Sequence, residues 1–400
     1  MYPSARSSAS LLSLAALLSL SLMACSESVA GTPDMANAAP LGCEMSGTGP
    51  IALAVGLHAN APIPVIDPAL VDLMKESVKA RHPISLIRID GAPKGVFAER
   101  FTSDAGNDVA LDDDIDSYLT EVEQRITGSK EESIRAKAPE VDVLGAFARA
   151  ADSAGPRGNV VLIDPGLQTM APLDFRDMIN AEPAQVVTYL RGKSLIPDLK
   201  GRKVLLSGLG YPALPQLDPG SALRKNIVAI WKEIAQAGGA ACVAVNVVPN
   251  DKKAPESAPA VSVVPLPPMR DTFAPCEKAE LSDGNNVGFE QGKSRFRDLG
   301  AARKTLAKLA DTIRKHDLDV KLIGSTSSED TRAFNLRLSR ERAEAVKREL
   351  IALGVSTGSI TAEGHGERWE GRVHDLAPDG TLLPGLAARN RKVIAQLSCP

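Results

Sequence analysis

Short apolar runs of strand length alternate with helical patterns in the first half of the chain. Helical spacing of apolar residues marks 68–80, 144–151 and 222–237. The strand-like runs are 51–55, 84–89, 159–164, 203–207 and 241–248. Because strands that alternate with helices favour parallel pairing with helices on both faces, we predict an α/β fold with a doubly wound, mostly parallel sheet.

A strand, a polar loop and a helix follow one another between residues 320 and 350. Apolar side chains recur there at three- and four-residue spacing, in Phe334, Leu338, Ala345 and Val346. These side chains are expected to face a core. Asn335, Arg342 and the loop 324–328 are then left at the strand-to-helix corner, which is predicted to be a small-ligand site.

The order Asn-x-x-Leu-Ser-x-x-Arg-Ala-x-x-Val, starting at Asn335, resembles the OmpA-like peptidoglycan-binding domain of bacterial envelope proteins. The resemblance extends over residues 287–397 and implies a β-α-β-α-β sandwich with one further strand. Residues 287–289 resemble the family's first strand, 299–316 its first helix and 320–324 its second strand. Residues 354–355, 360 and 364–367 resemble its turn and third strand, and 389–393 the basic start of its last strand.

This resemblance implies non-catalytic binding of the diaminopimelate stem peptide of peptidoglycan by Thr326, Ser327, Asn335 and Arg342. In the family, an Arg at the position of Arg342 binds the carboxylate, for which a planar guanidinium is well suited. An Asp in the loop binds the ammonium, and here Ser327 stands in its place. A neutral hydroxyl cannot supply the ionic contact, so the affinity is expected to be lower by ~1–2 kcal/mol or more, unless Glu329 or Asp330 takes over.

The N-terminus resembles that of a bacterial lipoprotein. Arg6 precedes an apolar run, 11–23, which has the length of a secretion signal and is too short to span a membrane. The run ends in Leu-Met-Ala-Cys, which resembles a lipobox with Cys25 as the lipidated residue; an ordinary cleavable signal is the alternative. Ser26 after it is not the usual signal for retention at the inner membrane. The protein is thus expected in the cell envelope, at the outer membrane facing the periplasm in a diderm host and otherwise on the outer face of the plasma membrane.

The remaining four cysteines are an even number in an exported chain and suit two disulfides. Cys276 and Cys399 bracket the part that resembles the OmpA-like domain, whose first and last strands lie in one sheet in that family, so we expect them to pair. Cys43 and Cys242 are then left to pair with each other, although Cys242 could instead be a buried thiol.

The first half of the chain more weakly resembles the von Willebrand factor A fold, through its apolar first strand and the run Val-Val-Leu-Ile-Asp-Pro-Gly that ends at Gly166. The paired hydroxyls and carboxylate that hold metal in that fold are absent after residue 55, and no metal or cofactor is expected. The carboxyl ends of parallel strands are nevertheless where open α/β sheets bind ligands. The candidate residues there are His58, Asn60, Asp90 and Asp164.

Acidic residues at 112–116 lack the glycine and closing glutamate of a calcium loop and are predicted to begin a helix at 115–126. The chain has a net charge of −3, while residues 284–400 carry an excess of Lys and Arg. A basic surface there would favour encounter with the anionic cell wall. Nucleic acid is not expected as a partner.

Five regions are predicted. They are a signal peptide at 1–24, a tether at 25–49, an α/β domain at 50–249, a Pro-rich linker at 250–283 and an OmpA-like domain at 284–400. The predicted protein is a lipid-anchored, non-enzymatic, wall-binding protein whose α/β domain binds an envelope partner. The alternative is a protein with a degenerate wall site, whose work as an adaptor, or as an enzyme, is done by the α/β domain.

Overall fold

The computed structural model describes residues 43, 45, 49–130, 133–246, 253–266 and 272–399. The predicted signal peptide, Cys25 and most of the tether lie outside the described residues. In the first sheet region the elements are β1 (Ile51–Gly56), α1 (Pro68–Lys79), β2 (Ile84–Ile89), β3 (Lys94–Glu99), α2 (Asp108–Thr127), α3 (Val143–Ala154), β4 (Asn159–Ile163), α4 (Phe175–Met178), α5 (Pro183–Gly192), β5 (Lys203–Ser207), α6 (Gly220–Ala237) and β6 (Cys242–Asn246).

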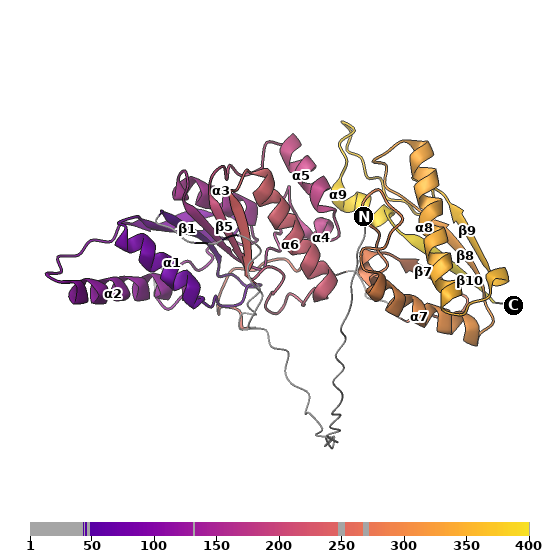
Figure 1. Cartoon of the computed structure of the whole chain (residues 1–400), viewed down its shortest axis with the longest axis horizontal. Helices are drawn as coiled ribbons and strands as arrows, with labels where there is room; N and C mark the ends of the chain where they lie inside the picture. The colour runs from indigo at the N-terminus through magenta and orange to yellow at the C-terminus, as the bar shows by residue number, and fades with distance from the viewer. Residues whose placement is uncertain are drawn as a thin grey trace, which may run out of the picture. The chain divides into compact units, whose positions relative to one another are not determined.

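These strands form one six-stranded sheet in the order β3-β2-β1-β4-β5-β6 (Figure 1). All neighbours are parallel except β2 and β3, which are antiparallel. Every residue of β1 is buried, and its alternate side chains enter two cores. Ile51 and Leu53 pack with the side chains of α1 and α2, whereas Ala52 packs with those of α3 and α6. The predicted mostly parallel α/β sheet is confirmed.

The second sheet is built from the C-terminal part of the chain. Its elements are β7 (Lys278–Leu281), the 3-10 turn η1 (Asp283–Asn285), α7 (Leu299–Lys315), β8 (Asp319–Gly324), α8 (Arg332–Ala352), the 3-10 turn η2 (Thr357–Ser359), β9 (Ile360–Gly364), α9 (Pro384–Asn390) and β10 (Val393–Ser398). The strand order is β7-β10-β8-β9, with β10 antiparallel to both neighbours and β8 parallel to β9.

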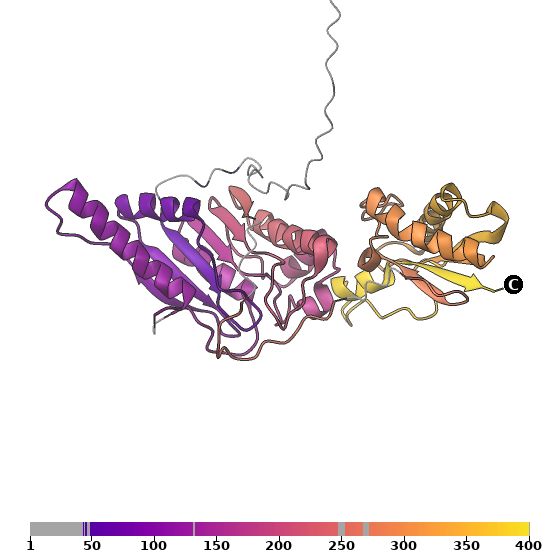
Figure 2. The same cartoon turned by 90° about the horizontal axis from the view of Figure 1, so that it is seen from below.

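Helices α7 and α8 cover one face of this sheet, as the orange helices above the strands in Figure 2 show. Leu306, Leu309 and Ile313 of α7 and Val346 and Leu350 of α8 share a buried core with the strands. Helix α8 begins where the Thr331 hydroxyl accepts a hydrogen bond from the amide of Phe334. Capping of this kind satisfies one of the free amides of a first helical turn.

Contrary to the prediction from the sequence, the segment 287–289 is not the first strand of this sheet. The chain turns there, because the amide of Val287 donates to the carbonyl of Ser282 and Asn286 has a φ of +65°. The first strand is β7, which lies within the predicted linker. With only four residues and polar Lys278 and Glu280 on one side, β7 has too weak an apolar pattern to be recognised.

Two helix boundaries also differ from the prediction. Helix α2 begins at Asp108, since the Asn107 side chain caps it by accepting from the amide of Ala110. The acidic residues at 112–116 therefore lie inside the helix, where Asp112 and Asp116 pair with lysines of α1. Residues 389 and 390, predicted to open the last strand, instead end α9. Among the described helices, none is both long and apolar enough to cross a membrane.

Candidate functional site

The predicted site lies where β8 meets α8, and close packing fixes that junction. A Cβ atom at Gly324 would come within 1.9 Å of the carbonyl oxygen of Ser339, and one at Gly364 within 2.4 Å of the amide of Arg340. Glycine is therefore required at both positions for β8 and β9 to approach the helix. This approach holds the buried row Asn335, Ser339 and Arg342 of α8 against the end of the sheet.

The loop after β8 is held by its main chain. The amide and hydroxyl of Ser325 donate to the carbonyls of Lys392 and Asn390, at 2.9 and 2.8 Å. The amide of Thr326 donates to the carbonyl of Gly366 at 2.9 Å. With two consecutive residues tied to neighbouring segments, the loop presents its side chains in a fixed position.

All four predicted site residues are almost fully buried, with exposed fractions of 2–4%. The Asn335 amide donates to the carbonyl of Asp330 at 3.0 Å and so closes the loop onto the helix. The hydroxyl of Thr326 has no hydrogen-bond partner among the described residues. A buried hydroxyl without a partner is costly, so this oxygen is available to a ligand or water.

Arg342 is buried and faces a different segment, the turn at 289–293. Its Nε donates to the carbonyl of Lys293 at 3.0 Å, and its guanidinium carbon lies 5.3 Å from the ring centre of Phe289. Only 2% of Arg342 is exposed, so it is not a solvated residue of the helix surface. That this corner binds a small ligand stays a prediction.

The charges of two further guanidinium groups, those of Arg391 and Arg297, affect the pKa of Arg342. Burial, together with the charges of Arg391 and Arg297, lowers the pKa of Arg342 to about 10, against an opposing effect of Asp283. Within the same cluster, Nε of Arg297 pairs with the Asp283 carboxylate at 3.0 Å. Arg342 stays charged at neutral pH, but its charge is unfavourable where it lies. A bound carboxylate would relieve that repulsion.

Asp375 is a residue of the site that the sequence analysis missed. It is fully buried, and its carboxylate accepts from the amide and hydroxyl of Ser328 at 2.9 and 2.8 Å and from Arg372 at 2.8 Å. Glu329 and Asp330, which were proposed as substitutes for the family's acid, are exposed instead. Asp375 lies 47 residues beyond Ser328 in a loop without regular spacing, so no sequence pattern points to it.

The polar residues at the carboxyl ends of the first sheet form two separate groups. His58 and Asp164 are both buried and contact each other, with Nε2 and Oδ2 3.0 Å apart. The amide of Asn60 donates to Nδ1 of His58 at 3.3 Å, which leaves the Nε2 proton for Asp164. Asp90 belongs to the other group, where it pairs with Arg88 and accepts from the amides of residues 137 and 138. The structure therefore joins three of the four candidates and assigns Asp90 a structural role.

No group of three or more His, Cys, Asp or Glu side chains suited to a metal ion occurs among the described residues. His365 lies beside Glu363, with Nε2 and Oε2 3.3 Å apart, on the surface. Both predicted disulfides are present. The Cα atoms are 5.5 Å apart in Cys43–Cys242 and 5.2 Å apart in Cys276–Cys399.

A mixed four-stranded sheet covered by two helices, with a buried arginine on the second helix, defines the C-terminal part as an α/β sandwich domain. Residues 288–377 match the OmpA family, so this part of the chain is an OmpA family domain.

Two curated proteins are similar to the same part of the chain. Outer membrane protein A of Bordetella avium is 33% identical over 106 residues, which cover 26% of this chain and 50% of that protein. The probable lipoprotein YiaD of Escherichia coli (strain K12) is 31% identical over 119 residues, which cover 30% of this chain and 50% of that protein. The chain thus spans about half the length of these relatives.

Two solved structures are also similar to this part. The peptidoglycan-associated lipoprotein from Burkholderia pseudomallei has 24% identity and a TM-score of 0.23, with coverage of 27% of this chain and 86% of that chain. The cell wall anchor of the T6SS from Pseudomonas aeruginosa has 26% identity and a TM-score of 0.23, with coverage of 28% and 75%.

Proposed function

We propose that the C-terminal domain binds peptidoglycan non-covalently, with Arg342 holding a carboxylate of the diaminopimelate stem peptide. The observation that carries this proposal is the surroundings of Arg342. Its guanidinium group is buried, and repulsion by the charges of Arg391 and Arg297 outweighs its attraction to Asp283. An anionic ligand removes this imbalance, and a guanidinium binds a carboxylate through two parallel hydrogen bonds. Names of two similar structures, a peptidoglycan-associated lipoprotein and a cell wall anchor, support the choice of ligand.

Thr326 and Ser327 complete the proposed site. The unpartnered hydroxyl of Thr326 offers a hydrogen bond to the ligand, and Ser327 takes the place at which the family has an acid. Because hydroxyls cannot supply an ionic contact to an ammonium, binding is weaker than in relatives that carry the Asp. Asp375 is engaged by Ser328 and Arg372, so its role in this proposal is to hold the loop rather than to bind the ammonium.

The whole protein is proposed to be a lipid-anchored envelope protein. Cys25 is the proposed lipid attachment point after the proposed signal peptide 1–24, and residues 25–49 are the proposed tether, which is joined to β6 by the Cys43–Cys242 disulfide. A similar protein, YiaD, is named a probable lipoprotein, which supports this assignment. The proposed location is the cell envelope, on the periplasmic side of the outer membrane in a diderm host. The OmpA-like domain takes part as a binding module and not as an enzyme.

The first sheet region is proposed to be a partner-binding module of von Willebrand factor A-like fold. Its predicted bounds, 50–249, are extended by residues 253–266, which pack on it. Its strand order, with one antiparallel edge strand β3, supports that likeness. The His58–Asp164 contact supports a site without metal, since the imidazole N–H already occupies a carboxylate oxygen that a cation would otherwise bind. Under the alternative function, the protein is an adaptor that works through this region and does not use the wall site.

Co-sedimentation with purified peptidoglycan tests the proposal. The full chain should sediment with the wall, and Arg342→Ala should largely remain in the supernatant. Arg348→Ala is a matched control, because Arg348 is an exposed arginine on the same helix and carries the same charge. Equal sedimentation of wild type and Arg342→Ala would favour the adaptor.

A further inference from the structure

Residues 253–266, expected to be part of a spacer, lie against the first sheet region. The carbonyl of Lys253 accepts from the amide of Ile63 at 2.9 Å, and that of Glu256 accepts from Arg135 at 2.9 Å. Further along, Val261 and Val264 are buried in the core that contains α3 and α6. We call residues 260–264 the strap.

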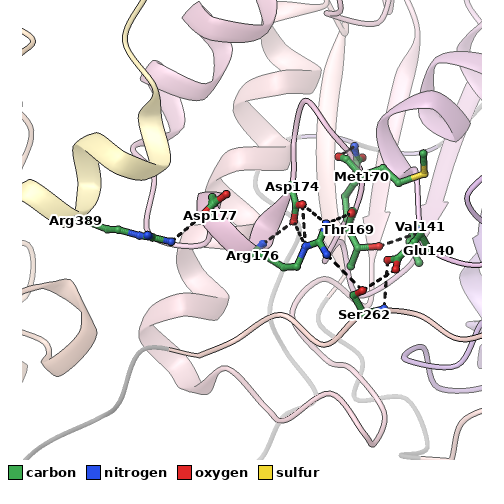
Figure 3. A network of polar contacts seen from close by, with 10 residues as sticks. Glu140, Val141, Thr169, Met170, Asp174, Arg176, Asp177, Ser262 and Arg389 are labelled. Atoms are coloured by element: carbon green, nitrogen blue, oxygen red, sulfur yellow. Dashed lines mark hydrogen bonds and ion pairs between the residues drawn. The ribbon is translucent and has the colours of Figure 1, made fainter. Parts of the chain in front are cut away.

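The strap is bound by side chains from segments that follow the parallel strands. Asn60 comes after β1, Arg176 after β4 and Gln216 after β5, so all three belong to the carboxyl edge of the sheet. Glu140, in the loop before α3, joins them, and Figure 3 shows it pointing at Ser262 together with Arg176. Ligands of open α/β sheets bind at this edge.

These side chains contact the main chain of the strap. The Gln216 carboxamide accepts from the amide of Val264 at 2.7 Å and donates to its carbonyl at 3.1 Å, as a neighbouring strand would. Asn60 donates to the carbonyl of Ser262 at 3.1 Å, and the amide of Glu140 donates to the carbonyl of Ala260 at 3.1 Å. Recognition through the main chain depends little on the sequence that is bound.

The groove that holds the strap contacts side chains at three positions, the hydroxyl of Ser262 and the two buried valines. Val261 and Val264 are 8% and 1% exposed, whereas Val263 between them is 44% exposed. An extended peptide with small aliphatic residues three positions apart would fill the two buried positions in the same way. The binding side chains are themselves built into the fold, since Gln216 is 1% and Asn60 4% exposed.

Glu140 is held in an unusual conformation to make its contacts. Its φ is +63°, in the left-handed region that side chains other than Gly and Asn rarely adopt. Its carboxylate accepts from the hydroxyl of Ser262 at 2.6 Å and from its amide at 3.3 Å. Arg176, held by Asp174, donates to the same hydroxyl at 3.4 Å (Figure 3). Backbone strain of this kind gathers at ligand-binding positions.

The strap leaves one polar group of the groove unused. The side-chain oxygen of Asn60 is buried and has no hydrogen-bond partner among the described residues. Buried acceptors are usually satisfied, so this oxygen marks a contact that a different ligand could make.

We propose that the carboxyl edge of the first sheet is a groove for an extended peptide segment of a partner protein, and that the strap occupies it as an internal ligand. The partner segment is read through its main chain by Gln216, Asn60 and Glu140, and it places two small aliphatic side chains where Val261 and Val264 lie. Because the strap belongs to the same chain, it competes at a high effective concentration and weakens partner binding until it is displaced. This inference does not depend on the wall-binding site.

A labelled peptide with the sequence of residues 258–266 serves as the probe, titrated into the full chain. The double variant Val261→Asp/Val264→Asp releases the strap and leaves the groove intact, so it should bind the probe about tenfold or more tightly than wild type does. Adding Gln216→Ala to this variant should abolish the gain. Adding Gln236→Ala, an exposed glutamine on α6, should not. Equal binding by wild type and the released variant, or binding unaffected by Gln216→Ala, would overturn the proposal.

Hydrogen exchange on the wild-type chain tests the same idea without a variant that could misfold. The amides of Ser262 and Val264 are hydrogen-bonded and should exchange slowly. Excess unlabelled probe should accelerate their exchange as it displaces the strap, and a probe with aspartate at both valine positions should have no effect. Unchanged exchange at saturating probe would refute displacement.

Discussion

The hydroxyl and amide of Ser328 both donate to the buried carboxylate of Asp375, at 2.8 and 2.9 Å. Ser328 follows the position at which the OmpA-like family has its ligand-binding acid, and Asp375 comes from a loop that precedes α9. The loop after β8 is therefore held by a carboxylate at the edge of the site, and its conformation depends on that carboxylate staying ionised.

Asp375→Asn should destabilise the C-terminal domain by about 1–3 kcal/mol. The side-chain NH2 group of the asparagine would face the hydrogen-bond donors of Ser328 and Arg372, whose hydrogen bonds the carboxylate accepts. Burial alone would raise the pKa of Asp375, but the hydrogen bonds from Ser328, Asn390 and Arg372 outweigh it and lower the pKa. Its stabilising contribution is thus fully present above the unfolded-state pKa of about 3.9 and is lost as the pH falls through the folded-state pKa.

Urea unfolding at pH 7 and pH 3 measures this effect. Asp375→Asn should lose less stability on acidification than wild type. Glu370→Gln, which removes an exposed carboxylate from the same loop, should behave like wild type at both pH values. If Asp375→Asn matched wild type at pH 7, the loop would not depend on this carboxylate.

Ser327→Asp should tighten binding of diaminopimelate-containing fragments by about 5- to 30-fold, corresponding to ~1–2 kcal/mol, because it restores an ionic contact to the ligand ammonium. Calorimetry at pH 7 measures the affinity, and Ser356→Asp, at an exposed serine beyond α8, controls for added charge. Unchanged or weaker binding would mean that another group makes the ammonium contact or that the ligand is a different one.

Cys276→Ser/Cys399→Ser should destabilise the second sheet, since the disulfide closes a chain segment with a sequence separation of 123 between β7 and β10. The restricted entropy of the unfolded chain predicts that the disulfide stabilises the fold by about 4–5 kcal/mol, and strain in the folded protein usually lowers this contribution. Hydrogen exchange should rise in β7 and β10, whereas Cys43→Ser/Cys242→Ser should affect the first sheet. A Cys43–Cys276 peptide in non-reducing digests would contradict this pairing.

Cys25 should be labelled when cells are grown with a fatty-acid probe. Cys25→Ala should lose the label, while Cys43→Ala should keep it, because only the first cysteine follows the lipobox-like run. Incorporation of the probe into the Cys25→Ala chain would show that the lipoprotein assignment is wrong.

Much of the fold follows from local sequence. The runs of β1, β2 and β4 are buried throughout and mostly apolar, with Ser85, Arg88 and Asn159 as the polar residues. Such runs indicate parallel strands covered on both faces. Strand β3 was not predicted, since it is an edge strand whose residues are mostly exposed. The same applies to β7, which is recognised only through its pairing with β10.

The site was predictable only where its residues lie on one helix or one loop. Asn335 and Arg342 are seven residues apart on α8, so helical spacing places them on one face. Asp375, Arg297 and Arg391 reach the same region through tertiary packing, and no spacing in the sequence relates them to Ser327 or Arg342. The strap was predicted to be part of a spacer because the prolines on either side of it, Pro259 and Pro265 among them, are typical of linkers. Its docking depends on Asn60, Glu140 and Gln216, which are distant in sequence.

The contact between Arg342 and a ligand carboxylate is the central claim, and a calorimetric cycle tests it most directly. Wild type and Arg342→Ala are each titrated with a diaminopimelate stem peptide whose carboxylate is free or amidated. If the Arg342 guanidinium binds the ligand carboxylate, either change alone should weaken the binding free energy by about 1.5–3 kcal/mol. The two changes together should weaken it by little more than either change alone. Losses that add in full, or wild-type binding that is indifferent to amidation, would contradict the account.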